Sequence, residues 1–165
     1  MIDSLDLGLK GKVAIVAGGG GDLNGVGNGR AASILLAEAG AKVIVVDKNL
    51  SLANNTVNII REKGGEAIGI GGDLTQANEC KKVVEFSIDN WGRLDILDNN
   101  IGIASKLSVV DETEEYWDHL MNINLKPMFL MSKYAIPAMI NSGEGGSIVN
   151  ISSISATRPK GLTSY

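Results

Sequence analysis

Short apolar runs alternate with helical patterns along nearly the whole chain. The apolar runs predict strands at Lys12–Ala17, Lys42–Asp47, Glu66–Gly71, Leu94–Leu97 and Ser147–Ile151. Helical patterns occupy Arg30–Ala39, Ser51–Lys63 with Ser51 as its N-cap, Gln76–Trp91, Thr113–Leu125 and Pro127–Asn141. Strands that alternate with helices form a parallel sheet covered on both faces. The pattern therefore predicts a single α/β domain over residues 1–165, with a doubly wound parallel sheet in three α/β/α layers.

Composition excludes several other classes of protein. The formal net charge is −4 and the basic residues are scattered, so we expect no nucleic-acid partner. The chain has no apolar run of about 18 residues, so we expect no membrane span, and its start has no apolar signal segment. The single Cys80 excludes an internal disulfide and favours a reducing compartment, which predicts a cytoplasmic protein. No second His or Cys lies at metal-ligand spacing from His119, so we expect no metal site.

The segment after the first predicted strand is rich in glycine and leads directly into a helix. Gly27, Gly29 and Ala32 fit the pattern G-x-G-x-x-A of a Rossmann-type dinucleotide-binding fold. Glycine permits a tight turn and a close approach of backbone to a pyrophosphate, and the helix N-terminus offers free N–H groups to the phosphates. A merely flexible loop is the alternative. A Walker-type phosphate loop is disfavoured because no Gly-Lys-Ser/Thr follows the glycines.

Asp47 ends the second predicted strand, about 20 residues beyond the glycines, where an acid can accept both hydroxyls of the adenosine ribose. Its charge would repel a 2′-phosphate, so we predict NAD rather than NADP as the cofactor. Because the cation Lys48 is adjacent, NADP is not excluded as the cofactor. A strand-end aspartate that caps a turn is the alternative interpretation.

Several motifs in one order make the chain resemble the short-chain dehydrogenases/reductases over essentially its whole length. The family loop Thr-Gly-x-x-x-Gly-x-Gly corresponds to Ala17-Gly18 and Gly27-Asn28-Gly29, with alanine in place of threonine and a longer loop between the two parts. The resemblance implies that Gly18, Gly27, Asn28 and Gly29 bind the cofactor.

Two later segments are similar to the family's cofactor-binding turns. Asp73 and Leu74 resemble the pair beside the adenine ring, although an aspartate that caps the next helix is an equal alternative. Asn99-Asn100-Ile101-Gly102 resembles the Asn-Asn-Ala-Gly turn, in which Asn100 and Gly102 would lie along the nicotinamide ribose. Asp98 departs from the family, which has an apolar residue there. A buried carboxylate must find a donor, shift its pKa or disturb the strand end.

The resemblance also implies catalytic residues. Asn124 matches the asparagine of the catalytic tetrad, which helps to hold a water in a proton relay. Ser153 matches the catalytic serine, which orients the substrate oxygen, and Tyr165 matches the tyrosine of Tyr-x-x-x-Lys, the general acid/base. The activity implied is NAD(P)-dependent hydride transfer between the nicotinamide and an alcohol or ketone.

The sequence ends at Tyr165, so the family's lysine and its last strands and helices lie outside the 165 residues. A non-catalytic NAD-binding fragment or pseudoenzyme is therefore the alternative function. A third candidate is a methyltransferase that uses S-adenosylmethionine, but the Asn-Asn-x-Gly turn and the pair Ser153 and Tyr165 argue against it. Because the family's helix at Pro127–Asn141 pairs subunits, we expect a homo-oligomer.

Overall fold

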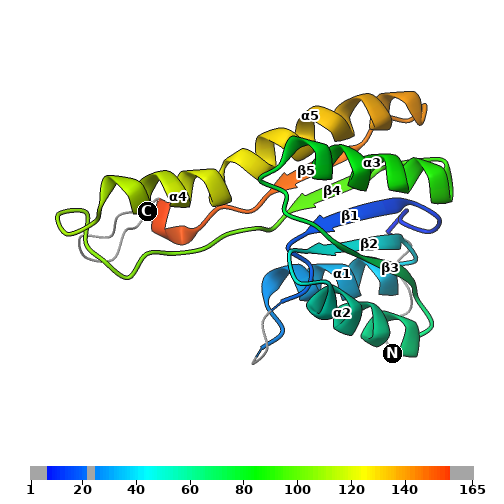
Figure 1. Cartoon of the computed structure of the whole chain (residues 1–165). Helices are drawn as coiled ribbons and strands as arrows, with labels where there is room; N and C mark the ends of the chain where they lie inside the picture. Colours follow the sequence, from blue (N-terminus) through cyan, green and yellow to red (C-terminus); the bar gives the residue numbers. More distant parts are fainter. Residues whose placement is uncertain (1–6, 22–24, 157–165) are drawn as a thin grey trace.

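Five parallel strands form one sheet in the computed structural model, which describes residues 7–21 and 25–156 (Figure 1). The order across the sheet is β3-β2-β1-β4-β5. The strands are β1 (Val13–Ala17), β2 (Lys42–Asp47), β3 (Glu66–Gly71), β4 (Ile96–Asn99) and β5 (Ser147–Asn150). The chain changes direction across the sheet between β1 and β4, so a crevice is expected at the carboxyl ends of these two strands.

Helices cover both faces of the sheet and give the three predicted layers. Figure 1 shows α1 and α2 on one face and α3 and α5 on the other. The helices are α1 (Asn28–Glu38), α2 (Leu50–Glu62), α3 (Ala77–Trp91), α4 (Glu114–Asn124) and α5 (Lys126–Asn141). The Rossmann-type doubly wound α/β fold predicted from the sequence is therefore confirmed.

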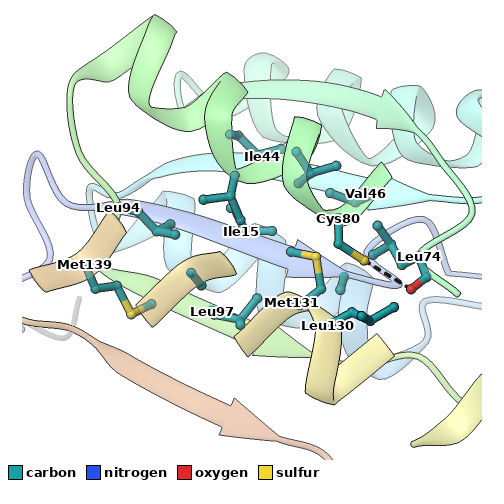
Figure 2. Packing of buried hydrophobic residues seen from close by; sticks show 14 of the residues in the cluster. Ile15, Ile44, Val46, Leu74, Cys80, Leu94, Leu97, Leu130, Met131 and Met139 are labelled. Atoms are coloured by element: carbon teal, nitrogen blue, oxygen red, sulfur yellow. Dashed lines mark hydrogen bonds between the residues drawn. The ribbon is translucent and has the colours of Figure 1, made fainter. Parts of the chain in front are cut away.

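Alternate residues of the central strands pack into two separate hydrophobic cores, one on each face of the sheet. Ile15 and Ile44 point to the side of α3 and α5, where Leu97 and Met131 join them (Figure 2). The intervening residues of the same strands pack on the other side with apolar residues of α1 and α2. Burying one such side chain contributes about 1.5–3 kcal/mol, so the continuous apolar runs of β1 and β2 hold both helical layers on the sheet.

Several predicted boundaries differ from the structure by one or two residues, and the largest differences lie at the fourth strand, the first helix and the N-cap of the second helix. The fourth strand begins and ends two residues later than predicted, because backbone pairing continues through Asp98, which lies in register with Val16 of β1. The first helix starts at Asn28 instead of Arg30, so Gly29 lies in its first turn. The N-cap of α2 is Asn49, whose side chain accepts a hydrogen bond from the backbone N–H of Ser51.

Cys80 is a core residue. Its side chain is fully buried, and its thiol donates to the carbonyl of Leu74 over 3.1 Å (Figure 2). Burial raises the pKa of Cys80 to about 11, which opposes thiolate formation. In the part of the chain that the structure describes, no helix is long and apolar enough to cross a membrane.

Candidate functional site

A cleft of about 390 Å³ lies at the carboxyl ends of β1 to β4. Loops after all four strands contribute to it, together with Ile123 and Pro127 at the junction of α4 and α5. Every residue that the sequence predicts as cofactor-binding lines this one cleft: Gly18, Gly27, Asn28, Gly29, Asp47, Asp73, Leu74, Asn100 and Gly102. The structure thus brings together residues that are spread over about half of the chain.

The glycine loop packs α1 directly against the end of β1. A Cβ on Gly29 would overlap the carbonyl oxygen of Gly18, so only glycine allows this approach. Gly18 has a φ of 85°, in the left-handed region that favours glycine. Gly27 precedes α1 as its N-cap and supplies no side-chain cap. The first N–H groups of α1 therefore remain without a side-chain cap at the wall of the cleft, where they can bind an anion.

Two residues that the sequence analysis missed brace this loop. The Arg30 guanidinium donates to the carbonyls of Gly20 and, over 3.1 Å, of Gly25, and its Nε donates to Thr56 Oγ1 over 3.1 Å. Thr56 is buried in α2 and its hydroxyl donates to the carbonyl of Gly19 over 3.0 Å. A hydroxyl from α2 thus supports the loop where Ala17 lacks one. A threonine among the apolar positions of α2 is the signal that could have revealed it.

Asp47 faces the loop and caps a turn at the same time. Its Oδ2 accepts from the N–H of Gly20 over 3.2 Å, and its Oδ1 accepts from the N–H of Asn49 over 2.9 Å. A Cβ on Gly20 would lie 2.5 Å from Asp47 Oδ2, so the loop closes over this carboxylate only because residue 20 is glycine. Asp47 therefore caps a turn, as the alternative interpretation predicts, and its side chain also lines the cleft.

Asp73 lies near Asp47 in the lining of the cleft and forms a turn of its own. Its carboxylate accepts from the hydroxyl of Thr75 over 2.7 Å and pairs with Lys48 over 3.1 Å. The hydrogen bond from the Thr75 hydroxyl is the main cause that lowers the pKa of Asp73. The N-cap position of α3 belongs to Gln76, so Asp73 is not the residue that caps this helix.

The ends of β4 and β5 carry a cluster of amides. Asn99 is buried, and its Nδ2 donates to Asn150 Oδ1 over 2.8 Å. Its Oδ1 has no hydrogen-bond partner among the described residues. The backbone N–H of Asn100 donates to the carbonyl of Ala17 over 2.8 Å, which ties the turn after β4 to β1. This turn forms the wall of the cleft opposite the predicted adenosine side.

The predicted catalytic residues do not all meet in the described structure. Asn124 ends α4, and its amide pairs twice with the backbone of Ile103, over 2.8 and 2.9 Å. Ser153 is exposed and outside the lining of the cleft, and its Oγ accepts from the N–H of Ser155 over 3.1 Å. Tyr165 lies outside the described residues.

The lining of the cleft fits a nucleotide with phosphate groups. Glycines leave a space that a Cβ would fill, an uncapped helix N-terminus faces it, and acidic side chains stand at one end. In the described residues, no three His, Cys, Asp or Glu side chains are grouped closely enough to hold a metal ion. A parallel sheet with such a cleft at its switch point defines the class of Rossmann-type dinucleotide-binding domains.

Comparison with known proteins gives the family. The sequence profile of the short chain dehydrogenase family matches residues 12–165. An uncharacterized oxidoreductase of Thermotoga maritima is 40% identical over 147 residues, which are 89% of this chain and 55% of the relative. The 2,5-dichloro-2,5-cyclohexadiene-1,4-diol dehydrogenase LinX of Sphingobium indicum is 37% identical over 158 residues, or 95% of this chain and 61% of the relative.

A solved structure agrees with these relatives. The 7α-hydroxysteroid dehydrogenase complexed with NADH and 7-oxo glycochenodeoxycholic acid has a TM-score of 0.85 and 33% sequence identity to this chain, covering 99% of this chain and 61% of that one. The chain belongs to the short-chain dehydrogenase family, as the motifs predicted. It spans between half and two thirds of the length of these relatives.

Proposed function

We propose that this protein is an oxidoreductase that transfers hydride between a nicotinamide dinucleotide and an alcohol or ketone. The observation that carries the proposal is the single cleft in which the glycine loop, Asp47, Asp73 and the turn at Asn100 meet. Family membership supports the same activity, since the relatives reported above are named as an oxidoreductase and dehydrogenases. The nicotinamide supplies the redox chemistry when bound, and the protein supplies position and electrostatics.

The residues of this chain would share the work along the cleft. The N-terminus of α1 would bind the phosphates, Asp47 the hydroxyls of the adenosine ribose, and Asp73 with Leu74 the adenine. Asn100 and Gly102 would lie beside the nicotinamide ribose. The family resemblance implies this division of roles, and the order of the strand ends along the cleft supports it.

The catalytic roles rest on the family resemblance. Tyr165 would exchange a proton with the substrate oxygen, and Ser153 would orient that oxygen by a hydrogen bond. Asn124 would act by holding the segment after β4, since both polar atoms of its amide bind the backbone of Ile103.

Within this proposal NAD is the cofactor in preference to NADP. Asp47 brings a negative charge to the part of the cleft expected to take the adenosine ribose, and a 2′-phosphate there would be repelled. Lys48, the adjacent cation, is paired with Asp73. An exposed pair of this kind is weak, so Lys48 remains available to a 2′-phosphate, and the preference for NAD rests on the charge of Asp47.

A second candidate is an NAD-binding protein without turnover. It is favoured by Ser153, whose hydroxyl is bonded locally and lies outside the lining of the cleft. Family membership removes the case for a methyltransferase.

Calorimetric titration with NAD and with NADP, followed by a turnover assay on a panel of alcohols, separates these candidates. Tighter binding of NAD with reduction of NAD by an alcohol is the expected result. Binding of NAD without turnover would favour the second candidate. A folded protein that binds neither dinucleotide would refute both.

A further inference from the structure

Asp98 is a buried carboxylate at the edge of the proposed site. It lies in register between Val16 of β1 and Val149 of β5, and only 6% of its surface is exposed. Burial raises the pKa of Asp98, and within the described part of the chain a hydrogen bond from Asn100 is the one contact that offsets this effect. A carboxylate in such a place destabilises the fold in its charged form, because no cation among the described residues pairs with it.

The hydrogen bond fixes which way the Asn100 amide points. Its Nδ2 lies 3.1 Å from one oxygen of Asp98 and 3.4 Å from the other. An ionised carboxylate only accepts hydrogen bonds, so the NH₂ group must face it and the carbonyl Oδ1 must face away. An apolar residue at position 98 would leave both orientations of the amide open.

Among the described residues, the other contacts that hold Asn100 are made by its backbone. Its N–H donates to the carbonyl of Ala17, and its own carbonyl packs against Gly18 so closely that a Cβ on Gly18 would lie 2.8 Å from it. Its side chain is half-buried and lines the cleft. No described residue donates a hydrogen bond to its Oδ1. The fold therefore sets the backbone, and Asp98 sets the side chain.

We propose that Asp98 is a positioning residue of the dinucleotide site: its carboxylate orients the amide of Asn100 and presents Asn100 Oδ1 to the cleft as an acceptor for a hydroxyl or amide N–H of the bound dinucleotide. This inference rests on the proposed function. A buried charge that opposes folding is typical of functional positions, where local rules are broken for the sake of a site.

Calorimetric titration of NADH into the wild-type protein and four variants tests the proposal. Asp98→Val removes the carboxylate, Asp98→Asn retains a polar partner, and Asn100→Ala removes the oriented amide. The double variant Asp98→Val/Asn100→Ala completes a double-mutant cycle. We expect NADH to bind about tenfold more weakly to Asp98→Val, by the loss of one oriented hydrogen bond, and the Asp98→Asn variant to lie between it and the wild type.

The double variant distinguishes positioning from separate effects. If Asp98 acts through Asn100, the double variant binds NADH no more weakly than Asn100→Ala alone. The proposal would be overturned if the fold loss of NADH affinity in the double variant equalled the product of the losses in the two single variants. It would also be overturned if Asp98→Val bound NADH as tightly as the wild type does. Should Asp98→Val fail to fold, wild-type affinity in Asp98→Asn would overturn it equally. Failure of the wild-type protein to bind NADH would instead refute the proposed function.

Discussion

At the scale of single residues, acidic side chains distinguish this site. Asp47 and Asp73 are held by backbone N–H or hydroxyl groups at the ends of β2 and β3, where their charge is partly hydrated. Asp98 is buried at the end of β4, and among the described residues the Asn100 amide is its one side-chain partner. The first two are compatible with local turn geometry, whereas the third opposes folding.

The burial of Asp98 gives a prediction for stability against pH. A carboxyl whose pKa is raised in the folded state stabilises the protein when protonated, and this contribution is lost as the pH rises through the folded-state pKa. We therefore expect Asp98→Asn to melt a few degrees above the wild type at neutral pH, since about 1 kcal/mol shifts Tm by roughly 2–4 °C at this size. Thermal unfolding should show the two curves converge in acid. A constant difference at all pH values would contradict this assignment.

Replacement of Asp47 tests the choice of cofactor. Hydrogen bonds to a charged group contribute about 1.5–3 kcal/mol, so Asp47→Asn should weaken NAD binding roughly 10- to 100-fold. Binding of NADP should weaken less, because the repulsion of its 2′-phosphate is also removed. Parallel titrations with both dinucleotides measure the ratio. An unchanged ratio would show that Asp47 does not select between them.

At the scale of elements, the contact between α1 and the end of β1 forms the cleft. Gly29→Ala should push α1 away from Gly18, lower the melting temperature and abolish detectable NAD binding. Gly72→Ala is the matched control for stability alone, because a Cβ there would meet nothing nearer than 3.6 Å, although Gly72 also lines the cleft. Melting curves of both variants provide the comparison, and titration of Gly29→Ala with NAD measures the loss of binding. Equal melting temperatures of the two variants would mean that the close approach is unimportant.

The brace from α2 to the glycine loop gives a second prediction at this scale. Thr56→Val keeps the shape of the side chain but leaves the Gly19 carbonyl and the Arg30 Nε without this partner. Loss of such buried hydrogen bonds costs about 1–3 kcal/mol, or roughly 2–12 °C in Tm, taking 2–4 °C per kcal/mol. Thr56→Ser should retain most of the stability. Equal melting temperatures of the wild type and Thr56→Val would refute the brace.

The elements differ in how well their sequence predicts them. β1 and β2 are apolar runs buried on both faces, so their bounds could be predicted to within one residue. β4 was misplaced because its last two residues are polar and their pairing depends on β1 and β5. The residues that line the cleft could be predicted from the glycine motif and from the polar residues that follow the strand ends. The contacts of Arg30 could not be predicted, because they join α1 to a loop and to another helix, whereas the position of Thr56 in the apolar pattern of α2 was the one available signal.

At the scale of the whole molecule, the outer face of α5 carries exposed apolar residues. Phe129 and Ile140 are 62% and 65% exposed. This face supports the prediction of a homo-oligomer. We expect Phe129→Glu with Ile140→Glu to lower the apparent mass in light scattering. Leu35→Glu on α1, where Leu35 is 64% exposed, is the control. A wild-type protein that is already monomeric would contradict the prediction.

The central claim is that a nicotinamide dinucleotide binds in the cleft at the carboxyl ends of β1 to β4. Hydrogen–deuterium exchange with and without NADH tests it most directly. We expect slower exchange in the segments that line the cleft, at residues 25–29, 47–49, 72–75 and 100–103. We expect unchanged exchange in a second groove between α3 and α5, whose lining includes Val84, Ile88, Tyr134 and Ala138. Saturable binding of NADH without protection of these loops, or with protection confined to that groove, would contradict it.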